Sequence, residues 1–185
     1  MKVHPIIAIL VLALSPSIAR PDVVDSSANG FTLKTTLLIS AAPDEVYRLL
    51  VHNVGDWWDS AHTYSGDARN LTIDAKPMGC FCEKLPKGGG VRHMEVVFLA
   101  PGKTLGMTGA LGPLQSIGAA GNMKIELSAA SGGTKLDLSY AVSGYAAKGM
   151  NTWAAPVDAV LTQQFGRLKA FAEGGASALK PPQSK

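Results

Sequence analysis

The chain has 185 residues, enough for one domain of ordinary size, about 100–200 residues. With 46% hydrophobic and 17% charged residues, the composition excludes a disordered chain. The net charge is +3 and no basic cluster occurs, so we expect no nucleic-acid partner. Twenty glycines and eleven prolines indicate many turns and disfavour a helical bundle, and two cysteines are too few for a disulfide-stapled scaffold.

Residues 1–19 have the pattern of a signal peptide. Lys2 precedes an apolar run at positions 6–14, and Ser17-Ile18-Ala19 is a small-x-small cleavage site. The run is too short to span a hydrocarbon core of about 30 Å as a helix. We expect cleavage near Ala19 and a periplasmic or secreted mature chain without stable membrane insertion; an uncleaved anchor is the alternative. The polar residues 20–30 that follow are expected to form a flexible segment.

The first regular elements are a strand and a helix. Apolar residues alternate with polar ones over positions 31–39, which predicts a half-buried strand. Pro43 suits the first turn of a helix, and Asp44 and Glu45 favour the positive end of the helix dipole. The helix ends near Gly55, and a loop rich in aromatic residues follows at positions 56–64.

The middle of the chain predicts an antiparallel meander. Apolar stretches at positions 71–75, 80–85, 91–99, 104–111, 122–129 and 134–143 are separated mostly by short turns that contain glycine. With the first strand they make seven. One connection differs, because the loop at 112–121 carries Leu114 and Ile117 and either buries them or covers a hydrophobic opening.

The C-terminal part predicts one long amphipathic helix over positions 152–173. Its apolar residues, from Val157 to Phe171, recur at intervals of three and four, and Gly174-Gly175 supplies the stop. A helix of this length, about 33 Å, can cross a whole sheet. Residues 174–185 contain two prolines and few apolar side chains, so we expect a disordered tail.

This order of elements resembles the helix-grip fold of the START-like (SRPBCC) superfamily over residues 31–173. The local marks are the helix opening at positions 39–47, the pair Trp57-Trp58 and the turn at positions 100–105. The resemblance implies an α+β fold in which a seven-stranded antiparallel sheet wraps around the long C-terminal helix. The superfamily includes cyclases, lipid carriers and chaperone-activator homologues, so it indicates fold better than function.

Strand pairing can be predicted from the turns. The hairpin at 86–90 pairs Cys82 with Met94 and Cys80 with Val96, and the last hairpin pairs Met123 with Tyr140. One face then collects the apolar residues, namely Cys80, Cys82, Met94, Val96, Phe98, Leu105, Met107, Met123, Ile125, Leu127, Leu136, Leu138 and Tyr140. The opposite face carries charged and polar residues, including Glu83 and His93.

The two cysteines are expected to be free, buried thiols. Residues i and i+2 of a regular strand stand too far apart for a disulfide unless the strand bulges. A soft-metal site for Cu(I), completed by Met94, is the alternative. No second cysteine pair or inward histidine supports such a site, so we expect no metal and no cofactor.

No catalytic residue is assigned from the sequence. His93 falls on the outward face and is expected to be solvated, and the carboxylates lie outward as well, so no inward pair indicates acid–base chemistry. The glycine clusters lack the lysine and the strand-loop-helix setting of a phosphate-binding loop. His62 lies in the aromatic loop, where it reaches toward the expected opening between sheet and helix.

These features favour a binder or carrier of a hydrophobic small molecule, lipid- or polyketide-like, held between the sheet and the C-terminal helix. The expected ligand contacts come from the aromatic loop and the middle strands: Trp57, Trp58, His62, Tyr64, Met94, Met107, Met123 and Tyr140. One alternative is a cyclase or dehydratase with Tyr140 or His62 as a proton-transfer group. Another is a protein-interaction module. Ligand identity and oligomeric state are not predicted.

Overall fold

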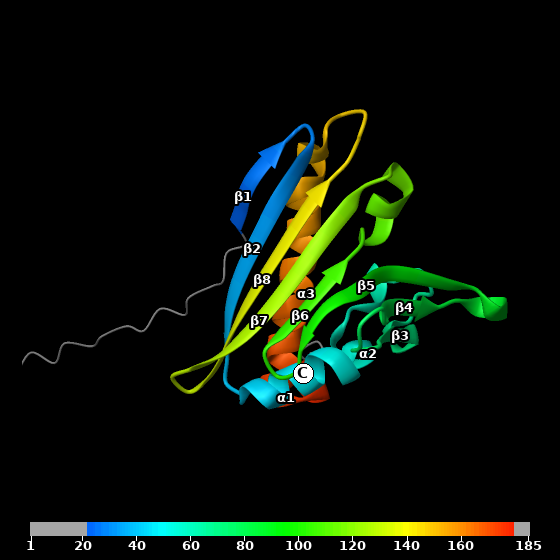
Figure 1. Cartoon of the computed structure of the whole chain (residues 1–185). Helices are drawn as coiled ribbons and strands as arrows, with labels where there is room; N and C mark the ends of the chain where they lie inside the picture. Colours follow the sequence, from blue (N-terminus) through cyan, green and yellow to red (C-terminus); the bar gives the residue numbers. More distant parts are fainter. Residues whose placement is uncertain (1–21, 180–185) are drawn as a thin grey trace, which may run out of the picture.

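The structure, a computed structural model, describes residues 22–179. The expected signal peptide and residues 180–185 of the expected tail lie outside this range. The described residues form one antiparallel sheet of eight strands in the order β1-β2-β8-β7-β6-β5-β4-β3 (Figure 1). The strands are β1 (Asp22–Ser27), β2 (Gly30–Ile39), β3 (Leu71–Ile73), β4 (Cys80–Lys84), β5 (Gly90–Ala100), β6 (Thr104–Thr108), β7 (Ala120–Ala130) and β8 (Gly133–Ser143).

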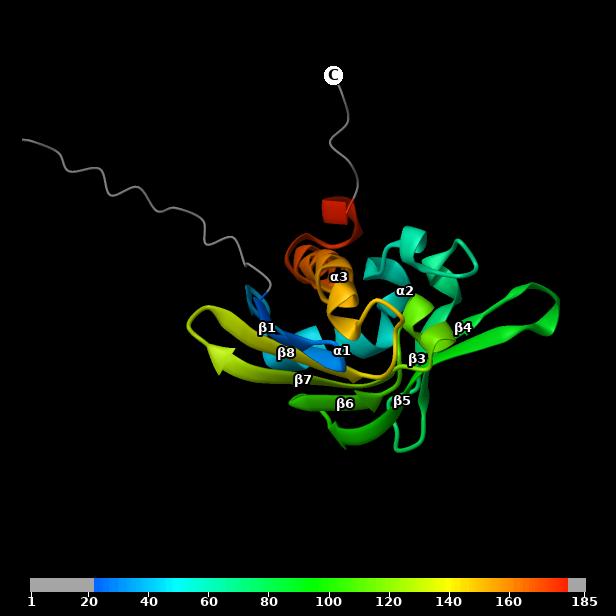
Figure 2. The same ribbon diagram turned by 90° about the horizontal axis from the view of Figure 1, so that it is seen from above.

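Within residues 22–179, three α-helices accompany the sheet: α1 (Pro43–His52), α2 (Val54–Trp57) and α3 (Ala154–Gly174). Short 3₁₀ segments lie between these elements: η1 (Ser60–His62), η2 (Ala68–Asn70), η3 (Pro86–Gly88), η4 (Gly112–Ile117), η5 (Met150–Trp153) and η6 (Ala176–Leu179). The sheet curves around α3, which lies along its inner face (Figure 2). The fold is therefore α+β, with an antiparallel sheet and a long C-terminal helix, and no helix within residues 22–179 is long and apolar enough to cross a membrane.

The sheet has eight strands, so the prediction of seven was wrong. The additional strand, β1, lies in the segment that was expected to be flexible, and it pairs with β2 across a tight turn at Ala28-Asn29. Its side chains from Val23 onward are exposed, so the segment lacks the apolar alternation by which strands are recognised. At the other end, η6 follows α3 directly, and Leu179 packs against the core.

The long strands follow the predicted pattern. Side chains of β2 alternate between buried and exposed, and β7 pairs with β8 as predicted, with Met123 opposite Tyr140 and Leu127 opposite Leu136. The helix α1 begins at Pro43 with two acidic residues in its first turn. One face of α3 is buried in the core. It includes Leu161, Phe165 and Leu168, which follow the spacing of three and four residues.

The pairing of β4 with β5 differs from the prediction by one residue at Cys80 and by two residues at Cys82. Phe81 pairs with Met94 and Cys82 pairs with Arg92, which leaves His93 as an extra residue in a β-bulge. On β4 it is therefore Phe81 and Glu83 that are buried, whereas the cysteines face outward. The predictions that Cys80 and Cys82 face inward and that Glu83 and His93 are solvated were wrong. A shift of one residue exchanges the two faces of a strand.

A second bulge lies between β5 and β6. Val96 pairs with Met107 and Phe98 pairs with Gly106, so Val97 is the extra residue. As a result Phe98 is 57% exposed, and its predicted place on the inner face was wrong.

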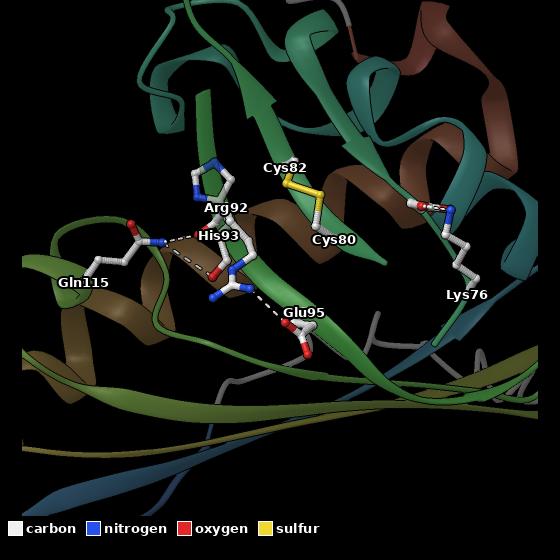
Figure 3. The surroundings of a disulfide bond; sticks show 8 residues. Lys76, Cys80, Cys82, Arg92, His93, Glu95 and Gln115 are labelled. Carbon is white, nitrogen blue, oxygen red and sulfur yellow. Dashed lines mark hydrogen bonds and ion pairs between the residues drawn. A yellow bond between two sulfur atoms is a disulfide. The ribbon is translucent and has the colours of Figure 1, made fainter. Parts of the chain in front are cut away.

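The two cysteines form a disulfide instead of the free thiols predicted (Figure 3). Their Cα atoms lie 5.3 Å apart, within the separation that a disulfide can bridge, about 4.4–6.8 Å. The bond lies on the outward side of β4, near Arg92 and Glu95, which form an ion pair (Figure 3). The pair is therefore not arranged as the Cu(I) site considered above.

Candidate functional site

One large cavity, of about 390 Å³, opens at one end of α3. It lies between the first half of α3, the aromatic loop and the segment around η4. Its walls are mainly apolar and include several aromatic rings, and it is lined by Trp58, Ala61, His62, Thr63, Tyr64, Leu71, Phe81, His93, Leu111, Gly112, Pro113, Leu114, Trp153, Pro156, Val157, Val160 and Leu161. Its volume is within the range of small-molecule sites, about 300–1,000 Å³.

The middle of the sheet holds a much smaller cavity, of about 10 Å³, roughly the volume that admits a single water molecule. Trp57, Met107 and Met123 are among its lining residues. Side chains therefore fill the space above the central strands. The open space lies beside β4 and β5 instead.

The structure brings together only some of the residues expected to contact a ligand. Trp58, His62 and Tyr64 line the large cavity. Trp57 is 1% exposed, donates its indole N–H to the backbone oxygen of Leu49 and packs in the core. The remaining residues lie in the core away from the large cavity: Met94, Met107, Met123 and Tyr140.

Tyr140 has a structural place in the fold. Its hydroxyl donates to the backbone oxygen of Gly109 and accepts the backbone N–H of Leu111, so it holds the end of β6 against β8. Burial raises the pKa of Tyr140 to about 12, and the N–H of Leu111 opposes that rise. The side chain does not reach the large cavity.

The aromatic loop is fastened to α3 by polar contacts. The side-chain oxygen of Gln164 accepts the backbone N–H of Asp59, and Gln163 donates to the Asp59 carboxylate. Arg167 donates to the backbone oxygen of Trp57, and Gln163 also bonds the Nε2 atom of His62. Because these contacts join segments about a hundred residues apart, they position one wall of the cavity against the opposite wall.

His93 lines the same cavity and forms a buried titratable pair with Glu83, which does not itself line the cavity. The Nε2 atom of His93 lies 3.0 Å from a carboxylate oxygen of Glu83, and the two residues are 6% and 2% exposed. The backbone N–H groups of Tyr64 and Ser65 also donate to this carboxylate. The carboxylate therefore joins β4, β5 and the aromatic loop at one point.

Burial and hydrogen bonding decide the protonation of this pair. Burial alone would raise the pKa of Glu83, but the hydrogen bonds from Ser65, Tyr64 and His93 outweigh it and hold the pKa below its ordinary value. Burial lowers the pKa of His93, and the neighbouring Glu83 carboxylate only partly opposes that effect. At neutral pH the pair is thus an ionised carboxylate and a neutral imidazole.

Aromatic rings hold the imidazole in place. Tyr64 stacks on His93 with ring centres 5.9 Å apart, and Phe81 lies 5.1 Å from it on a tilted plane. On the strand side, Gly109 allows β6 to approach the bulge, because a Cβ atom there would lie only 2.5 Å from the backbone oxygen of His93. The ring is therefore confined by its neighbours.

Sequence reasoning missed Glu83, His93 and Phe81 as site residues, because the bulge at His93 reverses the faces on which they were placed. A signal existed in the sequence: a carboxylate and a histidine both occur on strands of one hairpin, at positions that a single bulge turns inward. No group of three or more metal-ligating side chains occurs within the part of the chain that the structure describes.

No protein-family model matches the chain, and no curated protein sequence matches it. Solved structures share the fold. A conserved protein of unknown function from Enterococcus faecalis, EF2215, has a TM-score of 0.58 at 17% identity, over 84% of this chain and 77% of that chain. CalU16 from Micromonospora echinospora has a TM-score of 0.54 at 14% identity, over 91% of this chain and 88% of that chain.

DynU16, from the dynemicin biosynthetic locus, has a TM-score of 0.58 at 16% identity. The match covers 80% of this chain and 49% of DynU16, so this chain spans about half the length of that protein. At such identities the likeness shows a shared fold and nothing about chemistry.

Proposed function

We propose that the chain is a helix-grip protein of the START-like type that binds a hydrophobic small molecule, lipid- or polyketide-like, in the cavity beside α3. The observation that carries this proposal is the cavity itself, with a volume of about 390 Å³ and mainly apolar walls. The rings of Trp58, Phe81 and Trp153 offer flat apolar surfaces, which suit an aromatic or polycyclic ligand.

We further propose that the mature chain acts after export to the periplasm or the medium. The support is the signal-peptide pattern of residues 1–19, with cleavage near Ala19. The disulfide between Cys80 and Cys82 agrees with an oxidising compartment. Sequencing of the N-terminus of protein recovered from the periplasm or the medium tests this part. Intact residues 1–19 on cytosolic protein would overturn it.

A second candidate is an enzyme that acts on such a ligand, and a specific observation favours it. Glu83 and His93 are titratable, buried and hydrogen-bonded to each other at the cavity wall, as a general base and its orienting carboxylate would be. The protein-interaction alternative gains nothing comparable, because a deep apolar cavity serves a small molecule better than a partner surface.

The binding proposal is tested with prodan, a neutral naphthalene dye whose emission shifts to the blue in apolar surroundings. Val160 on α3 lines the cavity, whereas the neighbouring Ala159 is exposed. Wild type is expected to bind the dye, Val160→Trp to bind it at least tenfold more weakly because the indole fills the cavity, and Ala159→Trp to match wild type. Absence of binding to wild type, or equal affinity in both variants, would refute the proposal.

A further inference from the structure

Several polar groups of the residues that line the cavity are engaged within the protein. The hydroxyl of Thr63 donates to the backbone oxygen of Ser60 at 2.7 Å, and Nε2 of His62 pairs with Gln163 at 3.1 Å. Nε2 of His93 pairs with Glu83. The Nδ1 atom of His93 has no hydrogen-bond partner among residues 22–179, and it is not one of the fully buried unpaired polar atoms there, so it is open to the cavity that His93 lines.

The state of that nitrogen follows from its neighbours. The Glu83 carboxylate receives donors from Tyr64, Ser65 and His93 and can only accept when ionised. Nε2 of His93 therefore carries the hydrogen, and Nδ1 of the neutral ring presents a lone pair. A ligand that fills the cavity displaces water from this acceptor, so a ligand that supplies a donor restores a hydrogen bond that a ligand without a donor loses.

The charge around the cavity selects against anionic ligands. The negative charge of Glu83 lies directly behind His93, and the cavity walls within the described residues contain no lysine or arginine. A ligand carboxylate would leave water without a counter-charge and face a buried anion, which is unfavourable. A neutral ligand avoids both costs.

We propose that the cavity selects a neutral, flat, apolar molecule that carries a hydroxyl or N–H donor, and that this donor bonds Nδ1 of His93. The inference rests on the proposed binding function and adds the chemical class of the ligand. Glu83 acts as a positioning residue, because it holds the imidazole in the tautomer that accepts. His93 determines specificity between donor-bearing ligands and their blocked analogues.

Three naphthalene probes of similar size test the proposal at neutral pH. 2-Naphthol has a donor, 2-methoxynaphthalene has none, and 2-naphthoate is an anion. Wild type is expected to bind naphthol about 3- to 10-fold more tightly than the ether, as one neutral hydrogen bond gives, and to bind naphthoate least. In His93→Phe, which keeps an aromatic ring between Tyr64 and Phe81, the ratio of the two dissociation constants should approach one.

A measurement on the wild-type protein tests the same proposal if His93→Phe fails to fold. The ¹⁵N resonance of Nδ1 of His93 should show an unprotonated nitrogen that shifts when naphthol binds and not when the ether binds. As a matched control, His52→Phe replaces an exposed histidine on α1 and should leave the preference for naphthol unchanged.

The outcomes separate the two proposals. If wild type binds prodan but takes naphthol and its ether equally, the donor inference fails while the binding function stands. If naphthoate binds most tightly, the inference fails because an unrecognised cation must face the ligand. If no probe of any kind binds, both proposals fail.

Discussion

The two halves of the sheet are built differently. In one half β2, β8 and β7 contain 10, 11 and 11 residues and pair without any register shift. In the other half β4 and β6 contain five residues each, and both of their pairings with β5 include a bulge. The regular half packs apolar side chains against the core, whereas the irregular half holds the disulfide, the buried Glu83–His93 pair and the cavity.

This difference shows how a polar side chain can be placed at the wall of an apolar cavity in an antiparallel sheet. An in-register strand presents every second residue to the core, and in β7 and β8 those residues are almost all apolar. The bulge at His93 adds one residue and turns consecutive side chains, His93 and Met94, to the interior. Irregular pairing is thus the means by which a polar group reaches the wall of an apolar cavity.

The largest expected effects are on the free energy of unfolding, and they compare a buried polar residue of the irregular half with a buried apolar residue of the regular half. Glu83→Ala should lower the free energy of unfolding by about 3–5 kcal/mol, because the N–H groups of Tyr64, Ser65 and His93 lose their buried acceptor. Leu136→Ala in the regular half should cost a similar amount, about 2–5 kcal/mol, through a cavity in the core. Urea unfolding measures both. A cost below about 1 kcal/mol for Glu83→Ala would mean that water reaches the carboxylate.

The two halves should then differ in their response to acid, with a smaller effect. The folded-state pKa of His93 is below its ordinary 6.5, so the unfolded chain takes up the proton first and stability falls as the pH drops below that value. Glu83, with a lowered pKa, adds a further loss below its ordinary 4.5. His93→Gln should flatten the dependence between about pH 7 and pH 5, whereas Leu136→Ala should keep the wild-type slope. An unchanged slope in His93→Gln would contradict a buried neutral imidazole.

The regular half was also the part that sequence reasoning predicted well. Alternation in β2 and in the hairpin of β7 and β8 specified the faces of Leu33, Leu127 and Leu136, because in an unbroken strand the sequence period is the structural period. The helix α3 was found for the same reason, with a period near 3.6 over 21 residues.

The candidate site was predicted only in part, for a physical reason. Trp58, His62 and Tyr64 were placed near an opening because the resemblance to helix-grip proteins implies one beside the loop that follows the first helix, and they line the cavity. Glu83 and His93 were placed on the wrong face, since a bulge is decided by tertiary packing and leaves no period of its own. The methionines were expected in a cavity above the middle strands, but that space is filled.

The disulfide is expected to have an intermediate effect. Native protein should have a mass two hydrogens below that of its reduced form. The bond closes a loop of only three residues, from Cys80 to Cys82, so replacing both cysteines by serine should cost about 1–2 kcal/mol by chain entropy. A dithiol mass for the native protein would contradict the disulfide.

The smallest effects on stability should come from surface ion pairs. Substituting these pairs tests whether the two halves of the sheet differ only in their buried residues. Lys135–Asp137 lies on the regular half and Arg92–Glu95 on the outer side of the bulge, and each pair has partly exposed side chains. Asp137→Asn and Glu95→Gln should each change the free energy of unfolding by less than about 1 kcal/mol, since water screens such pairs. Both should leave prodan affinity unchanged, because neither carboxylate lines the cavity. A several-fold loss of affinity in Glu95→Gln alone would mean that the outer ion pair supports the bulge. The position of His93 would then depend on both faces of the sheet and not on the buried carboxylate alone.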